Sequence, residues 1–333
     1  MNLWLPAASA NAAKVDQLIW ALLSISLAVL ALVFGLMFRY IVKYRAGSPL
    51  DRGVVAEKTW RIETAWTAGT LLVFFGLFVW GADLYVRAFQ PPRDVLEIYV
   101  IGKQWMWKVE HVGGQREINA LHIPTGRPIE LVMTSEDVIH DFSVPAFRLK
   151  HDVLPDRYEI LWFIANRPGT YSLYCTQFCG LNHSKMTGEV VVLPPPEFQA
   201  WLAQNGGSGT LAAEGQVLFM RYGCSGCHGG NGRGDGGDAG RSDAGGSGAG
   251  RSDGQSAVRA PSLLGLYGSP VPLSDGTVVV ADDRYIHDSI VRPQSQIVAG
   301  FAPLMPSFAG QIGEEDLVKL IAYIKSLAPE RPL

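Results

Sequence analysis

Two uncharged stretches near the N-terminus set the first limit on how this 333-residue chain can fold. Residues 18–38 are 21 consecutive positions without a charged side chain, and residues 65–82 are 18 more. Each stretch is long enough to cross a bilayer as a helix, so we expect membrane spans at about 18–40 and 64–86. Buried helices of a globular core are the alternative, and they fit these lengths poorly. The first stretch lacks the features of a cleavable signal peptide, which predicts that it is retained.

Basic residues predict the orientation of this helical pair. Six lysines and arginines lie between the two stretches, whereas Lys14 is the single basic residue before them. Because positive loops stay on the cytoplasmic side, we expect a cytoplasmic loop and both termini outside, in the periplasm or the extracellular space. The net charge of −3 says little about partners. We expect membrane lipid among them and no nucleic acid.

Short β-type runs follow the second stretch. We expect strands at residues 95–101, 104–110, 128–134, 158–164, 170–174 and 189–193, each rich in β-branched and aromatic residues. Several short strands within about 100 residues predict a Greek-key β-sandwich. In a strand over 104–110, Trp105 and Trp107 would project to the same face.

The loop after the fifth predicted strand concentrates metal-binding side chains. Cys175, Cys179, His183 and Met186 fall within twelve residues, and a sandwich could bring His140 alongside them from an earlier strand-like segment. Thiolate, thioether and imidazole together favour copper over calcium or magnesium. A Cys175–Cys179 disulfide in an exported domain and a zinc site are the alternatives.

The pattern C-x3-C-x3-H-x2-M, with D-V-x-H upstream, resembles the binuclear CuA site of cytochrome c oxidase subunit II. The resemblance implies a cupredoxin domain. It assigns six ligands: Cys175 and Cys179 as bridging thiolates, His140 and His183 as terminal imidazoles, Met186 as a weak thioether ligand, and the backbone carbonyl of Gln177. It also assigns Trp105 as the residue through which electrons reach copper.

Two further residues are interpreted through this resemblance. Many family members have Glu where this chain has Gln177, and that carboxylate helps to hold magnesium at the contact with subunit I, so a magnesium site here is an open question. The segment E-T-x-W-T that begins at Glu63 resembles the family segment whose glutamate lies at the mouth of a proton channel. Glu63 would then assist proton uptake, and a solvated membrane flank is the alternative.

A second cofactor motif begins at Cys224. The sequence C-x-x-C-H, formed by Cys224, Cys227 and His228, predicts covalent haem c attachment through both thiols, with His228 as the proximal iron ligand. A redox dithiol or half a zinc site would use the same pattern. Its location outside the cytoplasm, a helix-like segment at 212–222 and a later methionine favour haem.

Met305 is the predicted distal ligand, because His/Met ligation is typical of cytochromes c. Met220 and His287 are the rival ligands. Met220 lies too close in sequence to reach across the haem, and His287 lies within a helical segment at residues 283–291.

The C-terminal part has the pattern of an α-helical domain. Apolar residues recur at helical spacing over 313–327, after an acidic first turn that suits the helix dipole. This part resembles a class I cytochrome c. The Gly-rich insert 229–254 cannot bury a core. We therefore expect an N-terminal arm and transmembrane hairpin (1–94), a cupredoxin CuA domain (95–196), a linker (197–209) and a cytochrome c domain (210–333).

As a whole, the chain resembles subunit II of a caa3-type oxidase, in which an electron donor is fused to its acceptor. The resemblance implies subunits I and III as partners and a small carrier such as cytochrome c as the donor. It implies oxygen reduction in another chain, coupled to proton translocation. A CuA-containing nitric oxide reductase, a tethered carrier without a catalytic partner and a quinol oxidase subunit are alternatives, although the last lacks the copper ligands.

Overall fold

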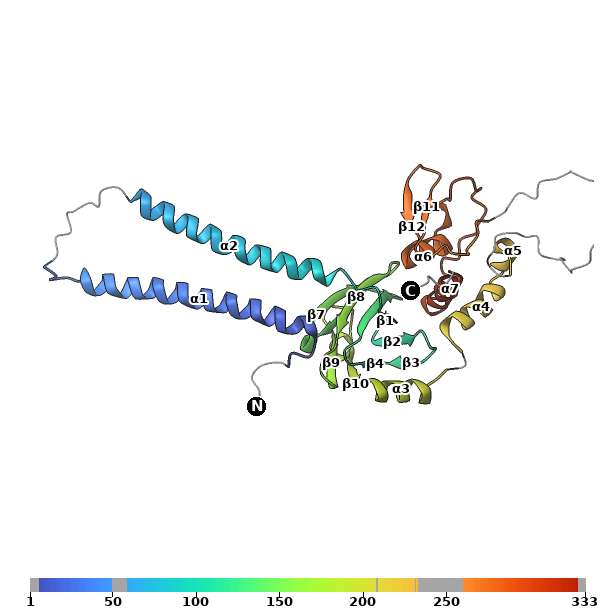
Figure 1. Cartoon of the computed structure of the whole chain (residues 1–333), viewed down its shortest axis with the longest axis horizontal. Helices are drawn as coiled ribbons and strands as arrows, with labels where there is room; N and C mark the ends of the chain where they lie inside the picture. Colours follow the sequence, from blue (N-terminus) through green and yellow to red (C-terminus); the bar gives the residue numbers. More distant parts are fainter. Residues whose placement is uncertain (1–5, 50–58, 208, 231, 233–259, 329–333) are drawn as a thin grey trace, which may run out of the picture.

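The computed structural model describes residues 6–49, 59–207, 209–230, 232 and 260–328. Two long helices, α1 (Ala10–Lys43) and α2 (Trp60–Ala88), extend away from the remainder of the chain (Figure 1). Both are apolar and long enough to cross a membrane, and their most apolar segments are not buried against other parts of the protein. The spans predicted at 18–40 and 64–86 lie inside these helices.

The first helix is fixed to the following domain at its N-terminal end. The hydroxyl of Ser9 accepts a hydrogen bond from the amide of Ala12, which caps the helix, and donates to the carbonyl of Phe147 at 2.9 Å. Arg148 donates to both carboxylate oxygens of Asp16, at 2.8 and 3.0 Å. These contacts hold the start of α1 against the β-domain.

The β-domain is a sandwich of two five-stranded sheets. One sheet has the order β3-β2-β1-β5-β8, formed by Arg116–Ile118, Met106–His111, Leu96–Lys103, Pro128–Ser135 and Glu159–Ile164. The other has the order β4-β10-β9-β6-β7, formed by Ala120–Pro124, Thr187–Leu193, Gly169–Cys175, His140–Val144 and Leu149–Val153. The β1–β5 and β4–β10 pairs are parallel, and the other pairs are antiparallel. Short helical turns η1 (Pro145–Phe147) and η2 (His183–Lys185) interrupt its loops.

The predicted sandwich is confirmed, but its strand list was incomplete. Three strands were not predicted, β3, β4 and β7, whereas β6 lies in the strand-like segment that was expected to carry His140. The strand predicted at 104–110 begins only at Met106, so Trp105 lies in the preceding turn. The expectation that Trp105 and Trp107 share one face of a strand is therefore wrong. Trp107 alone is fully buried in the sandwich core.

A helical domain follows α3 (Pro195–Gln204). Its described part contains four helices, α4 (Leu211–Arg221), α5 (Ser225–His228), α6 (Asp283–Val291) and α7 (Glu314–Ser326). The turn η3 (Pro293–Ser295) and the strand pair β11 (Pro270–Pro272) and β12 (Val278–Val280) lie between α5 and α7. The helices predicted at 212–222, 283–291 and 313–327 are confirmed within a residue or two at their ends. Most of the Gly-rich insert 229–254 lies outside the described residues.

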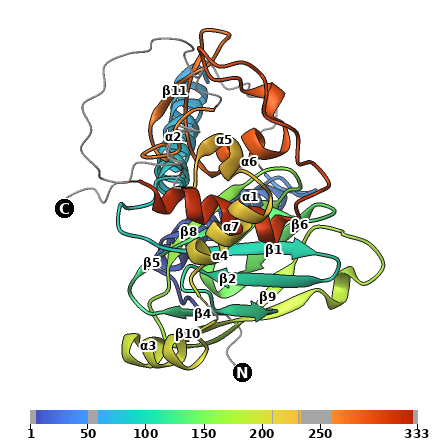
Figure 2. The ribbon, with the colours of Figure 1, turned by 90° about the vertical axis from the view of Figure 1, so that its right-hand side faces the viewer.

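The helical domain rests on the outer face of the first sheet, with α7 beside β1 (Figure 2). As a result β1 is buried on both faces. Ile98 and Val100 belong to the sandwich core, whereas Tyr99 and Ile101 belong to an apolar cluster shared with α4, α6 and α7. Helix α4 begins at the turn between β2 and β3, where the Leu211 amide donates to the Val112 carbonyl oxygen.

Helices α4 and α7 approach so closely at Gly215 that no side chain fits there. A Cβ atom on Gly215 would lie 1.9 Å from the carbonyl oxygen of Lys319 and 2.8 Å from Cβ of Tyr323. Both contacts are with rigid groups of a neighbouring helix. Backbone separation, and not side-chain adjustment, would have to absorb the extra atom.

We expect Gly215→Ala to destabilise the helical domain by about 1–3 kcal/mol, because the added methyl group forces α4 away from α7. Thermal unfolding of the solubilised protein, followed by circular dichroism, measures this. Gln216→Ala, at an exposed position of the same helix, is the control and should change stability by less than about 0.5 kcal/mol. Equal melting temperatures for Gly215→Ala and the unaltered chain would contradict the close packing.

Candidate metal centre and haem site

Pairing between β6 and β9 positions the first metal ligands. The two strands are antiparallel, and Phe142 lies opposite Cys175. His140 begins β6 and Cys175 ends β9, so both side chains lie at the same end of the sheet. The loop that follows Cys175 then folds back and brings four further ligand candidates to this end.

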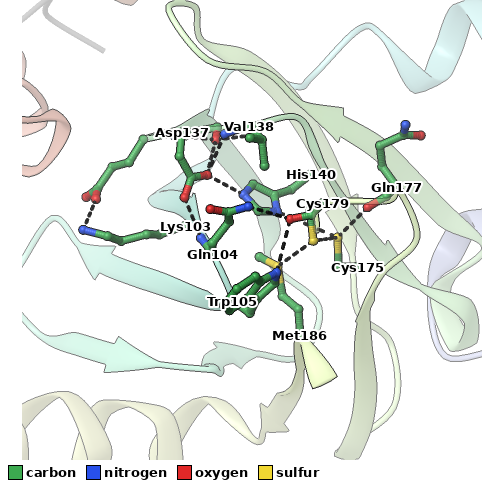
Figure 3. Close-up of polar contacts among 12 residues, drawn as sticks. Lys103, Gln104, Trp105, Asp137, Val138, His140, Cys175, Gln177, Cys179 and Met186 are labelled. Atoms are coloured by element: carbon green, nitrogen blue, oxygen red, sulfur yellow. Dashed lines mark hydrogen bonds and ion pairs between the residues drawn. The ribbon is translucent and has the colours of Figure 1, made fainter. Parts of the chain in front are cut away.

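All six predicted ligand groups converge there, and Figure 3 labels all of them except His183. The sulfur atoms of Cys175 and Cys179 are 3.7 Å apart and unbonded. Around them lie His140 Nδ1 at 3.9 Å and the Gln177 carbonyl oxygen at 3.2 Å from Cys175, and His183 Nδ1 at 3.4 Å and Met186 Sδ at 3.8 Å from Cys179. The amide of the Gln177 side chain points away from the sulfur atoms (Figure 3).

Asp137 orients the His140 ring. Its Oδ1 atom lies 2.8 Å from His140 Nε2, and the carboxylate also accepts hydrogen bonds from the backbone amides of Gln104 at 2.7 Å and Val138 at 2.6 Å. Burial alone would raise the pKa of Asp137, but these hydrogen bonds lower it below its usual value. A charged Asp137 therefore keeps the hydrogen on Nε2 and turns Nδ1 towards the sulfur atoms.

Without a bound metal, the pKa values of the two thiols are shifted in opposite directions. Burial disfavours the Cys175 thiolate, but hydrogen bonding with His140 and with backbone groups lowers the pKa of Cys175 to about 7. Burial and the adjacent Cys175 sulfur raise the pKa of Cys179 to about 12. A thiophilic cation must therefore displace the Cys179 proton when it binds both sulfur atoms.

Trp105 lies at the surface beside this cluster. Its indole Nε1 donates to the carbonyl oxygen of Cys179 at 3.2 Å, and Gln104 Nε2 donates to the same oxygen at 2.8 Å. Trp107 contacts the cluster from inside the core, with its ring centroid 6.0 Å from that of His140. Gly102 leaves room for that imidazole, because a Cβ atom there would lie 2.9 Å from His140 Cδ2.

The helical domain contains an apolar cavity next to the C-x-x-C-H motif. Cys224, His228 and Met305 line it together with largely apolar residues of α4, α6 and α7. His228 Nδ1 lies 3.0 Å from the carbonyl oxygen of Pro261, which can only accept a hydrogen bond. The hydrogen is therefore on Nδ1, and Nε2 is left with the lone pair that a metal ligand needs. Burial also lowers the pKa of His228, which favours the neutral ring.

The rival distal ligands do not line this cavity. Met220 is 51% exposed. His287 is buried, with its ring nitrogens 3.2 Å from Asp288 and 3.4 Å from Glu314. Cys227 is exposed and follows Cys224 within one short helix, α5.

Among the described residues, two polar atoms of the cavity wall lack a hydrogen-bond partner, and sequence reasoning did not identify them. Ser289 Oγ and Gln296 Oε1 are buried without a hydrogen bond. Such atoms suit a large apolar ligand with a few polar substituents, which is the character of haem. The chemistry of the two donor sets thus fits copper at the sulfur cluster and haem in the cavity.

Glu63 lies in the first turn of α2. The Thr59 hydroxyl donates to Glu63 Oε1 at 2.5 Å. Together with Thr64, Thr67 and Leu71, Glu63 lines an open hollow on the helix surface. The first turn of α2 lies at the end of the helix that is far from the β-domain and the helical domain (Figure 1).

Comparison with known proteins separates the same two domains. Residues 113–193 match the family model described as cytochrome c oxidase subunit II, periplasmic domain, and residues 212–328 match the model described as cytochrome c. The copper-type ligands His140 to Met186 lie inside the first match. The C-x-x-C-H motif and Met305 lie inside the second.

Relatives with curated names support this division. Heme-copper oxidase subunit 2 of Aeropyrum pernix is 34% identical over 160 residues, which cover 46% of this chain and 68% of that protein. Cytochrome c oxidase subunit 2 of Alkalihalophilus pseudofirmus is 26% identical over 328 residues, covering 94% and 86%. The alternative cytochrome c oxidase subunit 2 of Bradyrhizobium diazoefficiens is 29% identical over 178 residues, and this chain spans 62% of its length.

We expect Asp137→Asn to weaken copper binding by about 10- to 100-fold, because the group that orients the His140 ring loses its charge. Competition with a chelator, followed through the visible absorption of the copper-loaded protein, measures the affinity. Asp94→Asn is the control, since Asp94 is 96% exposed and pairs only loosely with Arg127, at 3.7 Å. Unchanged affinity in Asp137→Asn would show that the ring is held by packing alone.

Proposed function

Because the chain belongs to the subunit II family of haem-copper oxidases, we propose that it is the electron-transferring subunit II of a caa3-type oxidase. It takes electrons from a small carrier such as cytochrome c through a haem of its own. It passes them to a binuclear CuA centre and on to subunit I, where oxygen is reduced to water and protons are translocated. The observation that carries this proposal is the presence of two complete donor sets in one chain.

In the copper domain, Cys175 and Cys179 would bridge two copper ions. His140 and His183 would be terminal ligands, with Met186 and the Gln177 carbonyl oxygen as weaker ones. Such a centre supplies reversible one-electron transfer. The surrounding protein keeps water away, because His140, Cys179 and Met186 are at most 3% exposed. The neutral Gln177 amide provides no carboxylate for a magnesium ion, so we do not include magnesium in the proposal.

Trp105 is the proposed site of electron arrival at copper. Its hydrogen bond to the Cys179 carbonyl oxygen connects a partly exposed aromatic ring to a bridging ligand. Trp107 is fully buried and cannot meet a donor directly. The position of Trp105 in the turn between β1 and β2, at the surface, supports the assignment better than a position within the strand would.

In the helical domain, Cys224 and Cys227 would hold haem c covalently. His228 would bind its iron on one side and Met305 on the other. Ser289 and Gln296 are placed to satisfy polar groups of the haem, since both have a buried atom without a partner. His/Met ligation gives a potential suited to an electron acceptor from soluble carriers.

The proposed location is the cell membrane. Helices α1 and α2 would anchor the chain, with both redox domains in the periplasm or outside the cell and the intervening loop in the cytoplasm, as the basic residues predict. Subunit I, and with it subunit III, would pack against the apolar surfaces of the hairpin. The runner-up function is the corresponding electron-transferring subunit of another membrane reductase, such as a nitric oxide reductase.

We expect the purified chain, loaded in a host that exports and attaches haem, to contain two copper ions per haem. Its low-temperature EPR spectrum should show one electron delocalised over both copper ions, because two thiolates bridge them. Cys179→Ser should remove this signal and leave the haem spectrum intact. One copper ion, zinc, or a Cys175–Cys179 disulfide in the unaltered chain would contradict the copper assignment. Copurification with an oxygen-reducing or a nitric-oxide-reducing subunit distinguishes the two functions.

We further propose that Glu63 assists proton uptake from the cytoplasmic side. The resemblance of the E-T-x-W-T segment to a proton-channel mouth, and the open hollow that Glu63 lines with Thr64 and Thr67, support this role. Glu63→Gln should slow turnover of the assembled oxidase while the spectra of both cofactors stay unchanged. Glu197→Gln, on α3 and away from the membrane, is the control. Unaltered turnover and proton pumping in Glu63→Gln would show that this carboxylate is only a solvated flank.

A further inference from the structure

The helical domain and the β-domain share a buried interface. Tyr99, Ile101 and Val132 project from the outer face of the first sheet, where side chains would otherwise meet water, yet each is at most 1% exposed. They belong to the same apolar cluster as α7. The interface thus has an apolar centre of the kind found in stable protein–protein contacts.

Ionic contacts surround this centre at both ends of α7. At the C-terminal end, Lys325 Nζ lies 2.5 Å from Glu97 and 3.1 Å from Asp283. At the N-terminal end, Lys108 of β2 contacts Glu315 of α7 and lies 2.8 Å from Glu136 of the β-domain. The lysine at each end therefore connects the two domains through a pair of carboxylates.

Lys108 occupies the end of the interface that lies nearest to the copper ligands. Glu136 directly precedes Asp137, the carboxylate that orients His140. The Glu136 amide also donates to the carbonyl oxygen of Gly102, the residue that packs against the His140 ring. A continuous set of contacts thus runs from α7 through Lys108 and Glu136 to the support of a copper ligand.

The charge balance explains why Lys108 matters more than its neighbour. Its side chain is 17% exposed, and burial alone would lower the pKa of Lys108, but hydrogen bonds to Glu136 and Glu315 raise it. Lys103 contacts the same Glu136 at 2.7 Å, but it is 47% exposed and has no recorded contact with the helical domain among the described residues. Without Lys108, Glu315 of the helical domain would lose its lysine partner, and Glu136 of the β-domain would keep only the more exposed Lys103.

We propose that the haem-bearing domain is docked permanently on the outer face of the β3-β2-β1-β5-β8 sheet, and that Lys108 is the positioning residue that fixes it at the copper end. The linker then serves to join the domains and not to hold them together. The docking would matter for electron transfer only if the proposed function holds. An external carrier would reach the haem domain but not the sheet face that this domain covers.

The linker itself supports a fixed arrangement. A Cβ atom on Gly207 would lie 2.5 Å from the carbonyl oxygen of Gly114, in the turn between β2 and β3. The amide of Leu211, at the start of α4, donates to the carbonyl oxygen of Val112 in the same turn at 3.2 Å. The backbone is therefore packed against the β-domain on both sides of Ser208.

Cutting the linker tests the docking directly. A protease site inserted after Asn205 and an affinity tag at the C-terminus allow the helical domain to be captured after cleavage of the full-length protein in detergent. We expect the membrane-anchored part to stay bound to it. Lys108→Met should release that part about tenfold faster or more, because it removes an ammonium group, only 17% exposed, whose hydrogen bonds reach a carboxylate of each domain. Immediate separation of the unaltered halves would overturn the proposal.

Three variants separate positioning from general effects of charge or folding. Lys103→Met removes a contact to the same carboxylate and should dissociate like the unaltered protein, whereas Lys108→Arg should restore slow release. Glu315→Gln should accelerate release, and adding it to Lys108→Met should bring little further change. Equal release from Lys103→Met and Lys108→Met would overturn the role of Lys108.

Copper and haem contents and the melting temperature of each preparation show whether the variant is folded. The measured copper and haem contents also test the proposed function, independently of the docking. If copper or haem is missing from the unaltered chain, the proposed function fails, whereas the docking result is read from the captured protein alone. If both cofactors are present but the halves separate freely, only the docking inference fails.

Discussion

The antiparallel pairing of β6 with β9 is the constraint on which the metal centre depends. Without it, His140 and Cys175 would be 35 positions apart along the chain, with no reason to meet. Backbone hydrogen bonds fix the register, and the register places an imidazole and a thiol at one end of the sheet. The loop after Cys175 needs only to turn back once to add Cys179, His183 and Met186.

Burial of β1 on both faces connects this centre to the rest of the protein. One face packs into the sandwich core and the other packs beneath α7. The strand therefore contacts both domains, each of which has a candidate cofactor site. Lys108, on the neighbouring strand β2, contacts α7, and Gly102, near the end of β1, packs against the His140 ring. A cytochrome domain attached to a cupredoxin by a free tether would have left Tyr99 and Ile101 exposed to water.

The clustered donors could be predicted from sequence because their spacing is set by local chemistry, whereas His140 and Met305 lie outside both motifs and were assigned through the family resemblance and through typical His/Met ligation. The C-x3-C-x3-H-x2-M and C-x-x-C-H patterns place ligands within one loop or one helical turn each. The docking of the domains could not be predicted in this way, since Lys108 and Glu315 meet only through the tertiary fold. One signal was present: Ile98 to Ile101 form an unbroken apolar run, which is typical of a strand buried on both faces. Strand β2 was placed two residues too early because Trp105 has a high strand propensity but lies in a turn.

If the haem-bearing domain is docked, one chain holds its two redox centres at a single fixed separation. The magnetic dipolar interaction between the oxidised haem iron and the copper centre, measured by pulsed EPR in the frozen full-length protein, tests it most directly. A docked haem domain predicts one narrow distribution of distances that does not change when salt is added before freezing. A broad distribution, or one that shifts with ionic strength, would show that the haem domain moves on its tether and would contradict the account.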